Sequence, residues 1–460
     1  MNIFLYFLFF LLLTSCVTSK ITVPASDLEA GLPPDQQFSL VNNENNSSND
    51  LFFQSLDLND KIFELIGIAL KKNPGWMARL ARIELARAKV GYFIDESKAQ
   101  FNTSVEWAPG KENTRDSKFQ TQHTPEWRSQ ANFGWEFDLW GKWSAHKKEA
   151  QQFIDAEIYT QEGAQLMLIY EIAQLWYQYA YLEEDLSLIK NQIQNHQEFH
   201  ILHLHNYHAG LDSNQSLITM ENEIKTLVID YNQKKRELEI CKIQLSSLMG
   251  DPLDFNASNT VLFSQEPIPL PPARLPSHAL KNRPDILEAQ ARFIGQSQLA
   301  KASMLNLYPS INLNLTGVAM TSDLSKPFEQ WKVSGGPVLD IPIWSPQRKT
   351  QLSVDQKKLK VMELVWKETI LNAIQDIEAS LITHQSFLED FKISQSVEGG
   401  SLKLLNLITY KYEAGLLSKI DLLKKMNIAE QAKRKANAAQ LKCFYSFFNL
   451  SKSLGINWKK

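Results

Sequence analysis

A cluster of histidines is the feature of this sequence most able to do chemistry. Five of the nine histidines lie close together, at positions His196, His200, His203, His205 and His208. On a helix, His196, His200 and His203 share one face, because residues three and four apart are neighbours. Imidazoles change charge near neutral pH and bind borderline metals, so this trio could sense pH or hold a metal ion. The alternative is a solvated helix face that is rich in histidine.

Signatures of catalysis are missing from the rest of the sequence. It contains no phosphate-binding loop, no dinucleotide-binding fingerprint, no Gly-x-Ser-x-Gly and no His-Glu-x-x-His. The net charge of −3 gives no electrostatic basis for nucleic-acid binding. Cys241 and Cys443 each lie alone in a helical pattern, which favours structural thiols over a disulfide. We therefore expect no enzymatic activity, no cofactor and no nucleic-acid partner.

The first residues have the features of an export signal. The apolar run from Ile3 to Leu13 is too short for a transmembrane helix and suits the core of a signal peptide. Leu13-Thr14-Ser15-Cys16 resembles the lipobox of bacterial lipoproteins, in which Cys16 would carry the lipid. An ordinary cleaved signal with an incidental cysteine is the alternative. We expect a signal peptide over 1–15 and a lipid-anchored tether, rich in Asn, Ser, Asp and Pro, over 16–58.

Three short patterns occur twice, in the same order and at an offset of about 205 residues. The pairs are Ala69-Leu70-Lys71-Lys72-Asn73-Pro74 with Ala279-Leu280-Lys281-Asn282-Arg283-Pro284, Leu139-Trp140 with Ile343-Trp344, and Tyr207-His208-Ala209-Gly210-Leu211-Asp212-Ser213 with Tyr412-Glu413-Ala414-Gly415-Leu416-Leu417-Ser418. The constant order and offset predict an internal tandem duplication. We expect a first repeat over 59–250, a proline-rich linker over 251–277 and a second repeat over 278–460.

Long stretches without proline predict the helical part of each repeat. No proline occurs between Pro125 and Pro252 or after Pro346. Residues 143–206 could form one helix of roughly 95 Å, a length that favours coiled-coil-like packing. Gly210 and Gly415 would then form tight turns at the tips of antiparallel helix pairs. No stretch here reaches the ~18 apolar residues of a transmembrane helix, which argues against a helical membrane protein.

Four short segments alternate apolar with polar residues. They lie near 101–107 and 130–140 in the first repeat, and near 311–318 and 331–343 in the second. This period of two predicts strands with one apolar and one polar face. Pro337, in the fourth segment, removes a donor from its ladder. The strands could form a small soluble sheet or cross a membrane.

Membrane strands would require more than one copy of the chain. Strands of ~9–11 residues can cross a bilayer when tilted, and Trp135, Trp140 and Trp331 suit a bilayer interface. Four strands cannot close a barrel, because about eight is the minimum. An open edge would leave backbone groups unpaired in lipid. Several chains would have to close the barrel jointly, with the long helices continuing as a tube from one end.

This combination resembles the bacterial outer-membrane factors of the TolC and OprM type, in particular their NodT-like lipoprotein branch. Besides the lipobox, the matching segments are Glu136-Phe137-Asp138-Leu139-Trp140-Gly141-Lys142, Arg283-Pro284-Asp285-Ile286, Gly335-Gly336-Pro337-Val338-Leu339-Asp340-Ile341-Pro342-Ile343-Trp344 and Ser453-Leu454-Gly455-Ile456-Asn457-Trp458. The resemblance implies an α+β fold made mostly of long helices. In this family three copies build a trimeric α-barrel conduit and a twelve-stranded outer-membrane β-barrel, with four strands from each chain.

The same resemblance implies a function and partners. The chain would be the outer-membrane channel of a tripartite efflux system, anchored by lipid, such as palmitate, and extending into the periplasm. It would conduct small molecules passively from a periplasmic adaptor and an inner-membrane pump of the RND type to the exterior. The alternatives are the duct of a type I protein secretion system and a lipid-anchored periplasmic coiled-coil scaffold without a pore.

The family also implies a gate near the second glycine turn. Its members close the periplasmic end with helices that follow this turn, using an acidic ring and a constricting residue. The corresponding residues here are Ile420, Asp421 and Lys424. Lys424 stands where an acid is common, which would weaken a purely anionic ring, so Ile420 could act as an apolar constriction. The alternative for Asp421 is a solvated acid in the first turn of a helix.

Overall fold

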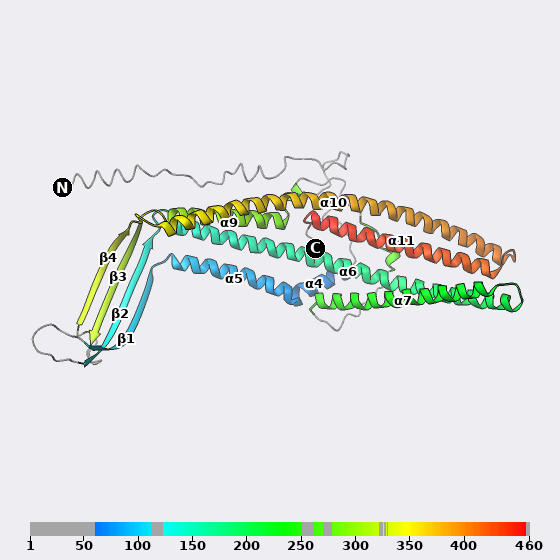
Figure 1. The fold of residues 1–460 in the computed structure, drawn as a ribbon, viewed down its shortest axis with the longest axis horizontal. Coiled ribbons are helices and arrows are strands. Elements are labelled where there is room, and N and C mark those ends of the chain that lie inside the picture. Colours follow the sequence, from blue (N-terminus) through cyan, green and yellow to red (C-terminus); the bar gives the residue numbers. More distant parts are fainter. Residues whose placement is uncertain are drawn as a thin grey trace, which may run out of the picture. The chain divides into compact units, whose positions relative to one another are not determined.

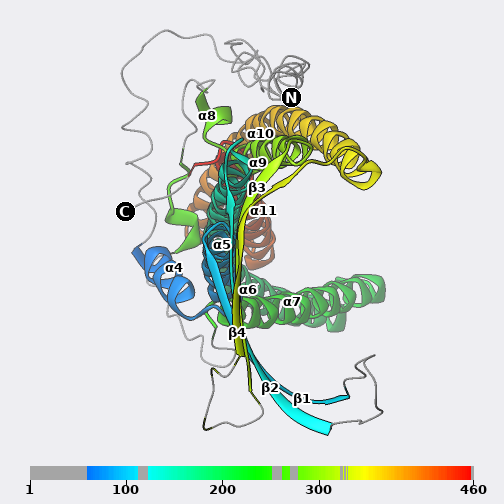
Figure 2. The same cartoon turned by 90° about the vertical axis from the view of Figure 1, so that its left-hand side faces the viewer.

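A computed structural model describes residues 60–111, 123–250, 262–269, 278–321 and 330–456, together with residues 325 and 328. The chain divides into two compact units, and the elements of each are drawn in Figures 1 and 2. Unit 1 contains 83–158 and 288–368, and unit 2 contains 35–82, 159–287 and 369–460, within the described ranges. The expected signal peptide, Cys16, the tether and most of the expected linker lie outside the described residues.

The two halves of the chain contain the same elements in the same order. The helices are α4 (Asp60–Lys72), α5 (Pro74–Glu96), α6 (Lys142–His208), α7 (Asn214–Leu248), α8 (His278–Lys281), α9 (Pro284–Leu305), α10 (Pro346–Glu413) and α11 (Lys419–Ser453), with a 3₁₀ helix η1 (Phe263–Gln265). The strands are β1 (Gln100–Lys111), β2 (His123–Phe137), β3 (Ser310–Thr321) and β4 (Gln330–Asp340). α6 and α10 have 67 and 68 residues, and α7 and α11 have 35 each. None of the helices in these ranges is both long and apolar enough to span a bilayer.

The strands form one antiparallel sheet in unit 1, in the order β1-β2-β3-β4. This confirms the four expected strands. β2 stops at Phe137 rather than near residue 140, because the next residue, Asp138, binds the start of α6 instead. Its carboxylate accepts hydrogen bonds of 3.0 Å from the backbone amides of Trp143 and Ser144. Pro337 is accommodated because β4 is an edge strand.

Small side chains bring the helices of unit 1 close together. Ala86, Val90, Ala150 and Ile154 form a buried cluster between α5 and α6. A Cβ atom on Gly295 of α9 would lie only 3.3 Å from the Cβ of a residue in α6. These contacts fix the helices from which the strands emerge.

The long helices of unit 2 lie in the order α7, α6, α11 and α10 (Figures 1 and 2). Cys241 of α7 donates a hydrogen bond to a carbonyl of α6, and Tyr177 of α6 stacks on Phe444 of α11 at 4.1 Å. Cys443 of α11 donates to a carbonyl of α10. Both cysteines are buried and free, so the prediction of structural thiols is confirmed. α7 and α10 form the two flanks of this layer.

The described part of the expected linker is packed against the helices of unit 2. Phe263 of η1 is buried in a core of aromatic and aliphatic side chains. The side-chain amide of Gln440 donates to the carbonyls of Phe263 at 3.3 Å and Glu266 at 2.8 Å. The backbone amide of Ser264 donates to Glu184 at 3.0 Å. Residues 262–269 are therefore fixed by the long helices they cross.

Candidate functional site

The sheet has one polar and one apolar face. Its register pairs odd-numbered residues with odd-numbered ones across every strand, as in the row Phe101, Phe133, Leu315 and Gly335. Residues directly opposite each other point to the same face of a sheet, so most of the apolar side chains of the four strands gather on one side, with Val318, Met320 and Val338 as exceptions. The next row, Asn102, Asn132, Thr316 and Ser334, belongs to the other face. There, the Thr316 hydroxyl donates to Asn132 at 3.1 Å.

The apolar face of the sheet is open to the surroundings. Phe101, Trp331 and Val333 are 67%, 71% and 67% exposed, respectively. Among the described strands, β1 and β4 each pair on one side only, which leaves both edges of the sheet free. A single copy therefore presents a large apolar surface and two unpaired strand edges, features that a soluble sheet avoids.

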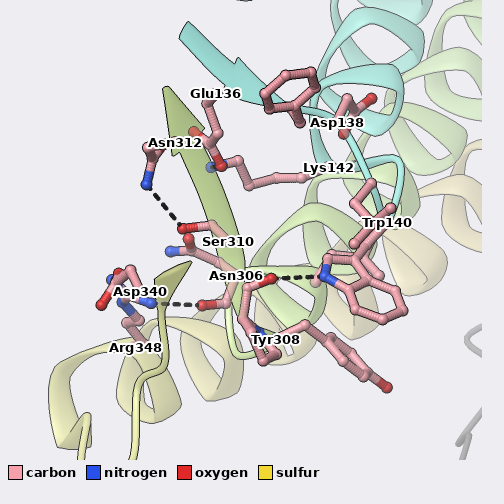
Figure 3. A pocket seen from close by; sticks show the side chains of 14 residues that line it. Glu136, Asp138, Trp140, Lys142, Asn306, Tyr308, Ser310, Asn312, Asp340 and Arg348 are labelled. Atoms are coloured by element: carbon pink, nitrogen blue, oxygen red, sulfur yellow. Dashed lines mark hydrogen bonds and ion pairs between the residues drawn. The ribbon is translucent and has the colours of Figure 1, made fainter. Parts of the chain in front are cut away.

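Two ion pairs fix the end of the sheet where the strands meet the helices (Figure 3). Lys142 of α6 pairs with Glu136 of β2 at 2.5 Å, and Arg348 of α10 pairs with Asp340 of β4 at 3.2 Å. Both acids come from the second strand of a repeat and both bases from the first turns of the following helix. The duplication has thus produced two similar anchors.

A polar cavity of about 210 Å³ lies between these anchors. On its wall, the indole of Trp140 donates a hydrogen bond of 2.7 Å to the carbonyl of Pro309, beside the ring of Tyr308 (Figure 3). Trp344, the counterpart of Trp140 in the second repeat, is 84% exposed. An indole with one polar and one apolar side is suited to the boundary between water and lipid.

The two glycine turns have the same backbone geometry. Gly210 joins α6 to α7 with φ of 73°, and Gly415 joins α10 to α11 with φ of 74°. The following amides, of Leu211 and Leu416, donate to carbonyls at the ends of the preceding helices at 2.8 and 2.9 Å. This bonding satisfies the last helical carbonyls with a residue in the left-handed region. The side chains of Leu211 and Leu416 are 78% and 72% exposed, so each turn presents an apolar tip.

The residues expected at the gate start helix α11. Asp421 forms a capping box with Ser418, whose hydroxyl donates to the carboxylate at 2.7 Å and accepts from the Asp421 amide at 3.2 Å. Hydrogen bonding by Ser418 and nearby Lys424 and Lys425 lower the pKa of Asp421. Lys424 is exposed, with its ammonium group 5.7 Å from the centre of the Phe199 ring, and Ile420 is half-buried. Asp421 is therefore an acid in the first turn of α11, where it caps the helix.

Of the three candidate histidines, His196 and His203 contact different residues, and the Nδ1 atom of His200 is buried without a hydrogen-bond partner. His196 lies 3.5 Å from Glu223 of α7. His203 contacts Asp212 of the first turn and meets Phe199 edge to face at 4.5 Å. Within the part of the chain that the structure describes, no group of three His, Cys, Asp or Glu residues could hold a metal ion. The trio is therefore not gathered into a metal site within these residues.

Sequence reasoning missed the ion pairs that join the two repeats. Lys419, at the start of α11, contacts Glu198 of α6. Further along, the Arg434 guanidinium binds Asp185 of α6 at 2.6 Å and Asp230 of α7 at 2.7 Å. The Arg434 and Asp185 partners are 249 positions apart in the chain, so no local pattern could have paired them.

The chain is similar to known proteins over most of its length. The family model described as "Outer membrane efflux protein" matches residues 65–251 and 275–456. Cation efflux system protein CusC of Escherichia coli strain K12 is 22% identical over 404 residues, covering 85% of this chain and 86% of CusC. "Probable outer membrane lipoprotein SilC" of Salmonella typhimurium is 22% identical over 416 residues, covering 85% of this chain and 86% of SilC. The crystal structure of the Campylobacter jejuni outer membrane channel CmeC matches with a TM-score of 0.76, at 18% identity, over 92% of this chain and 95% of CmeC.

The fold of long helices and a four-stranded sheet is thus that of outer-membrane channels. The chain belongs to the outer membrane efflux protein family, and it acts as an outer-membrane channel of an efflux system. The predicted family, the predicted class of function and the absence of an enzymatic role are confirmed by this membership. It also places the protein in the bacterial outer membrane.

Proposed function

We propose that three copies of this chain close a twelve-stranded barrel in the outer membrane, with the long helices forming a conduit in the periplasm. The observation that carries this proposal is the open sheet: an exposed apolar face, a polar opposite face and two free edges. Closure would pair β4 of one copy with β1 of the next and hide the backbone groups from lipid. The apolar face would then contact lipid, and the polar face would line the pore.

The helix tips would bind a periplasmic adaptor and pass cargo received from an inner-membrane pump of the RND type. Leu211 and Leu416 support this role, because each is exposed at the end of a rigid helix pair. Ile420, Asp421 and Lys424 would form the gate just above the second tip. We expect a small-molecule cargo that the pump selects, since a passive conduit of this kind makes few specific contacts.

A lipid on Cys16 would anchor the mature chain to the outer membrane. The support is the sequence Leu13-Thr14-Ser15-Cys16 and the similarity to SilC, a probable outer membrane lipoprotein. Metabolic labelling with a palmitate analogue tests this step. We expect label on the native protein and none on Cys16→Ser, whereas equal labelling of both would contradict a lipid at this position.

Conductance through a planar lipid bilayer tests the proposed pore. Purified protein should insert as discrete channels. Their closed state should depend on the helix tips at Gly210 and Gly415. A variant that lacks residues 103–128, and with them most of the hairpin of β1 and β2, should give no channels. Protein that is folded by circular dichroism but gives no current would contradict the proposal.

A further inference from the structure

The polar face of the sheet has unpaired positive charge towards the end that is away from the helices. Among the described side chains of the strands, its charged residues are Glu106, Arg128, Glu136, Lys332 and Asp340. Glu136 and Asp340 lie at the helical end, where each is paired with a base. Arg128 and Lys332 lie nearer the opposite end, and neither forms an ion pair with another described residue. These two cations can therefore bind an anion.

The two cations lie on either side of strand β3. Arg128 of β2 is opposite Met320, and Lys332 of β4 is opposite Val318. Neighbouring strands are about 4.8 Å apart, so β2 and β4 are separated by roughly 10 Å across the sheet. Arginine and lysine have long, flexible side chains, and both are exposed here. Their charged groups can therefore reach one anion above β3 from its two sides.

An apolar floor lies between the two cations. Val318 and Met320 are two of the apolar exceptions on the polar face, and both are half-buried. With the two cations and the amide side chains of Gln130 and Gln330, they line a hollow of about 340 Å³. Sites for small organic molecules begin at about 300 Å³ and combine apolar walls with a few polar groups. The hollow has the size and the lining of such a site.

The nearest acid on this face does not occupy the hollow. Glu106 of β1 is directly opposite Arg128, on the side of Arg128 that is away from β3. It is exposed, and within the described residues it forms no ion pair. One carboxylate beside two cations lowers the positive potential of this region but does not cancel it.

We propose that this hollow binds small organic anions in the outer part of the pore. The charged group of the anion would bind Arg128 and Lys332, and its apolar body would rest on Val318 and Met320. This inference rests on the proposed function, in which the polar face lines the pore, and it names a class of cargo that the pore favours. Several copies would place their hollows in one ring, where fixed cations raise the local concentration of anions.

Block of single-channel current in planar bilayers tests the site, with cyclohexanecarboxylate as the probe. We expect this probe to block the native channel. Acetate lacks the apolar body and cyclohexanemethanol lacks the charge, so neither should block. Arg128→Gln/Lys332→Gln should weaken the block roughly tenfold or more, because hydrogen bonds to charged groups are lost. The matched control Arg128→Lys/Lys332→Arg keeps both charges and should retain the block.

Reversal potentials in a KCl gradient measure the charge of the site without the probe. Arg128→Gln/Lys332→Gln should shift the ion selectivity towards cations, and Glu106→Gln should shift it towards anions. If the native channel and the Gln double variant have the same block and the same reversal potential, the anion site is overturned and the proposed pore stands. Equal block by cyclohexanemethanol would also overturn it. Native protein that forms no channels would instead contradict the proposed function.

Discussion

The ammonium group of Lys419 contacts the carboxylate of Glu198, which joins the start of α11 in the second repeat to α6 in the first. Hydrogen bonding to Glu198 raises the pKa of Lys419, so this lysine stays charged. The contact lies four residues after the Gly415 turn. The two helix pairs are therefore linked close to their tips, where a gate would have to open.

Breaking this link should favour the open state of the channel. Lys419→Glu would place two carboxylates together, and we expect a higher resting conductance in planar bilayers. Lys419→Glu/Glu198→Lys should return conductance to the native level. Lys403→Glu, an exposed lysine on α10 that forms no ion pair with described residues, is the matched control. If Lys419→Glu and the control have the same resting conductance, the contact of Lys419 with Glu198 does not hold the channel closed.

Replacing a turn glycine with alanine should lower stability through backbone strain alone, without any steric clash. A Cβ on Gly210, Gly415 or Gly399 would meet nothing within 4 Å, but only the first two have positive φ. Alanine at Gly415 should therefore lower stability by about 1–2 kcal/mol. Alanine at Gly399, inside α10, should raise it by about 0.5–1 kcal/mol.

Thermal unfolding of the detergent-solubilised protein distinguishes the two alanine variants. Equal shifts in melting temperature for Gly415→Ala and Gly399→Ala would mean that the left-handed turn contributes nothing specific. Circular dichroism at 222 nm follows the helices directly.

The two faces of the sheet should respond differently to the same charge. Val333→Arg puts a cation on the apolar face, which we expect to lower the assembled amount in the outer membrane, because a lipid-facing arginine costs about 2–4 kcal/mol near the midplane. Ser334→Arg, one position further on the polar face, should assemble normally and shift ion selectivity towards anions. Membrane fractionation followed by conductance measures both effects, and equal assembly of the two variants would refute the assignment of faces.

His384 should make the helical core sensitive to acid. It is almost fully buried against α11, where it shares a hydrogen bond of 2.9 Å with Ser446, and burial lowers its pKa from 6.5 to about 4. Between pH 6.5 and pH 4, this imidazole binds a proton in the unfolded chain but not in the folded chain. Stability should therefore be unaffected by this group above pH 6.5 and should fall by up to about 3 kcal/mol as pH drops to 4.

Melting temperatures at pH 7 and pH 4.5 measure this contribution. His384→Gln should lose less stability on acidification than the native protein. His205→Gln, which replaces an exposed histidine, should lose as much stability on acidification as the native protein. If His384→Gln and the native protein lose the same amount, the buried imidazole is not the source of acid sensitivity.

Local patterns predicted the elements of the fold well. Alternation across Phe133, Trp135 and Phe137 identified β2 because the sheet has one apolar face, and that face requires a period of two. Its end was predicted too far along the chain, since Asp138 was counted in the alternation although it caps α6. The duplicated glycines marked both turns because a left-handed residue is needed there.

Pairings between distant residues could not be predicted in the same way. His203 was grouped with its helical neighbours, but its partner is Asp212, which the turn brings back against the helix. In the second repeat these two positions are Ile408 and Leu417, so the duplication did not indicate this contact. The ion pairs of Arg434 and Lys419 depend on how whole helices are placed relative to one another. A short segment of sequence does not contain this information.

The mass of the detergent-solubilised complex tests the central account most directly, because one copy has too few strands to enclose a pore. Native mass spectrometry should give three times the mass of a single mature chain, and the signal should persist after removal of any acyl chains. A species with the mass of one chain, stable in detergent and still folded, would contradict the closure of the sheet by neighbouring copies.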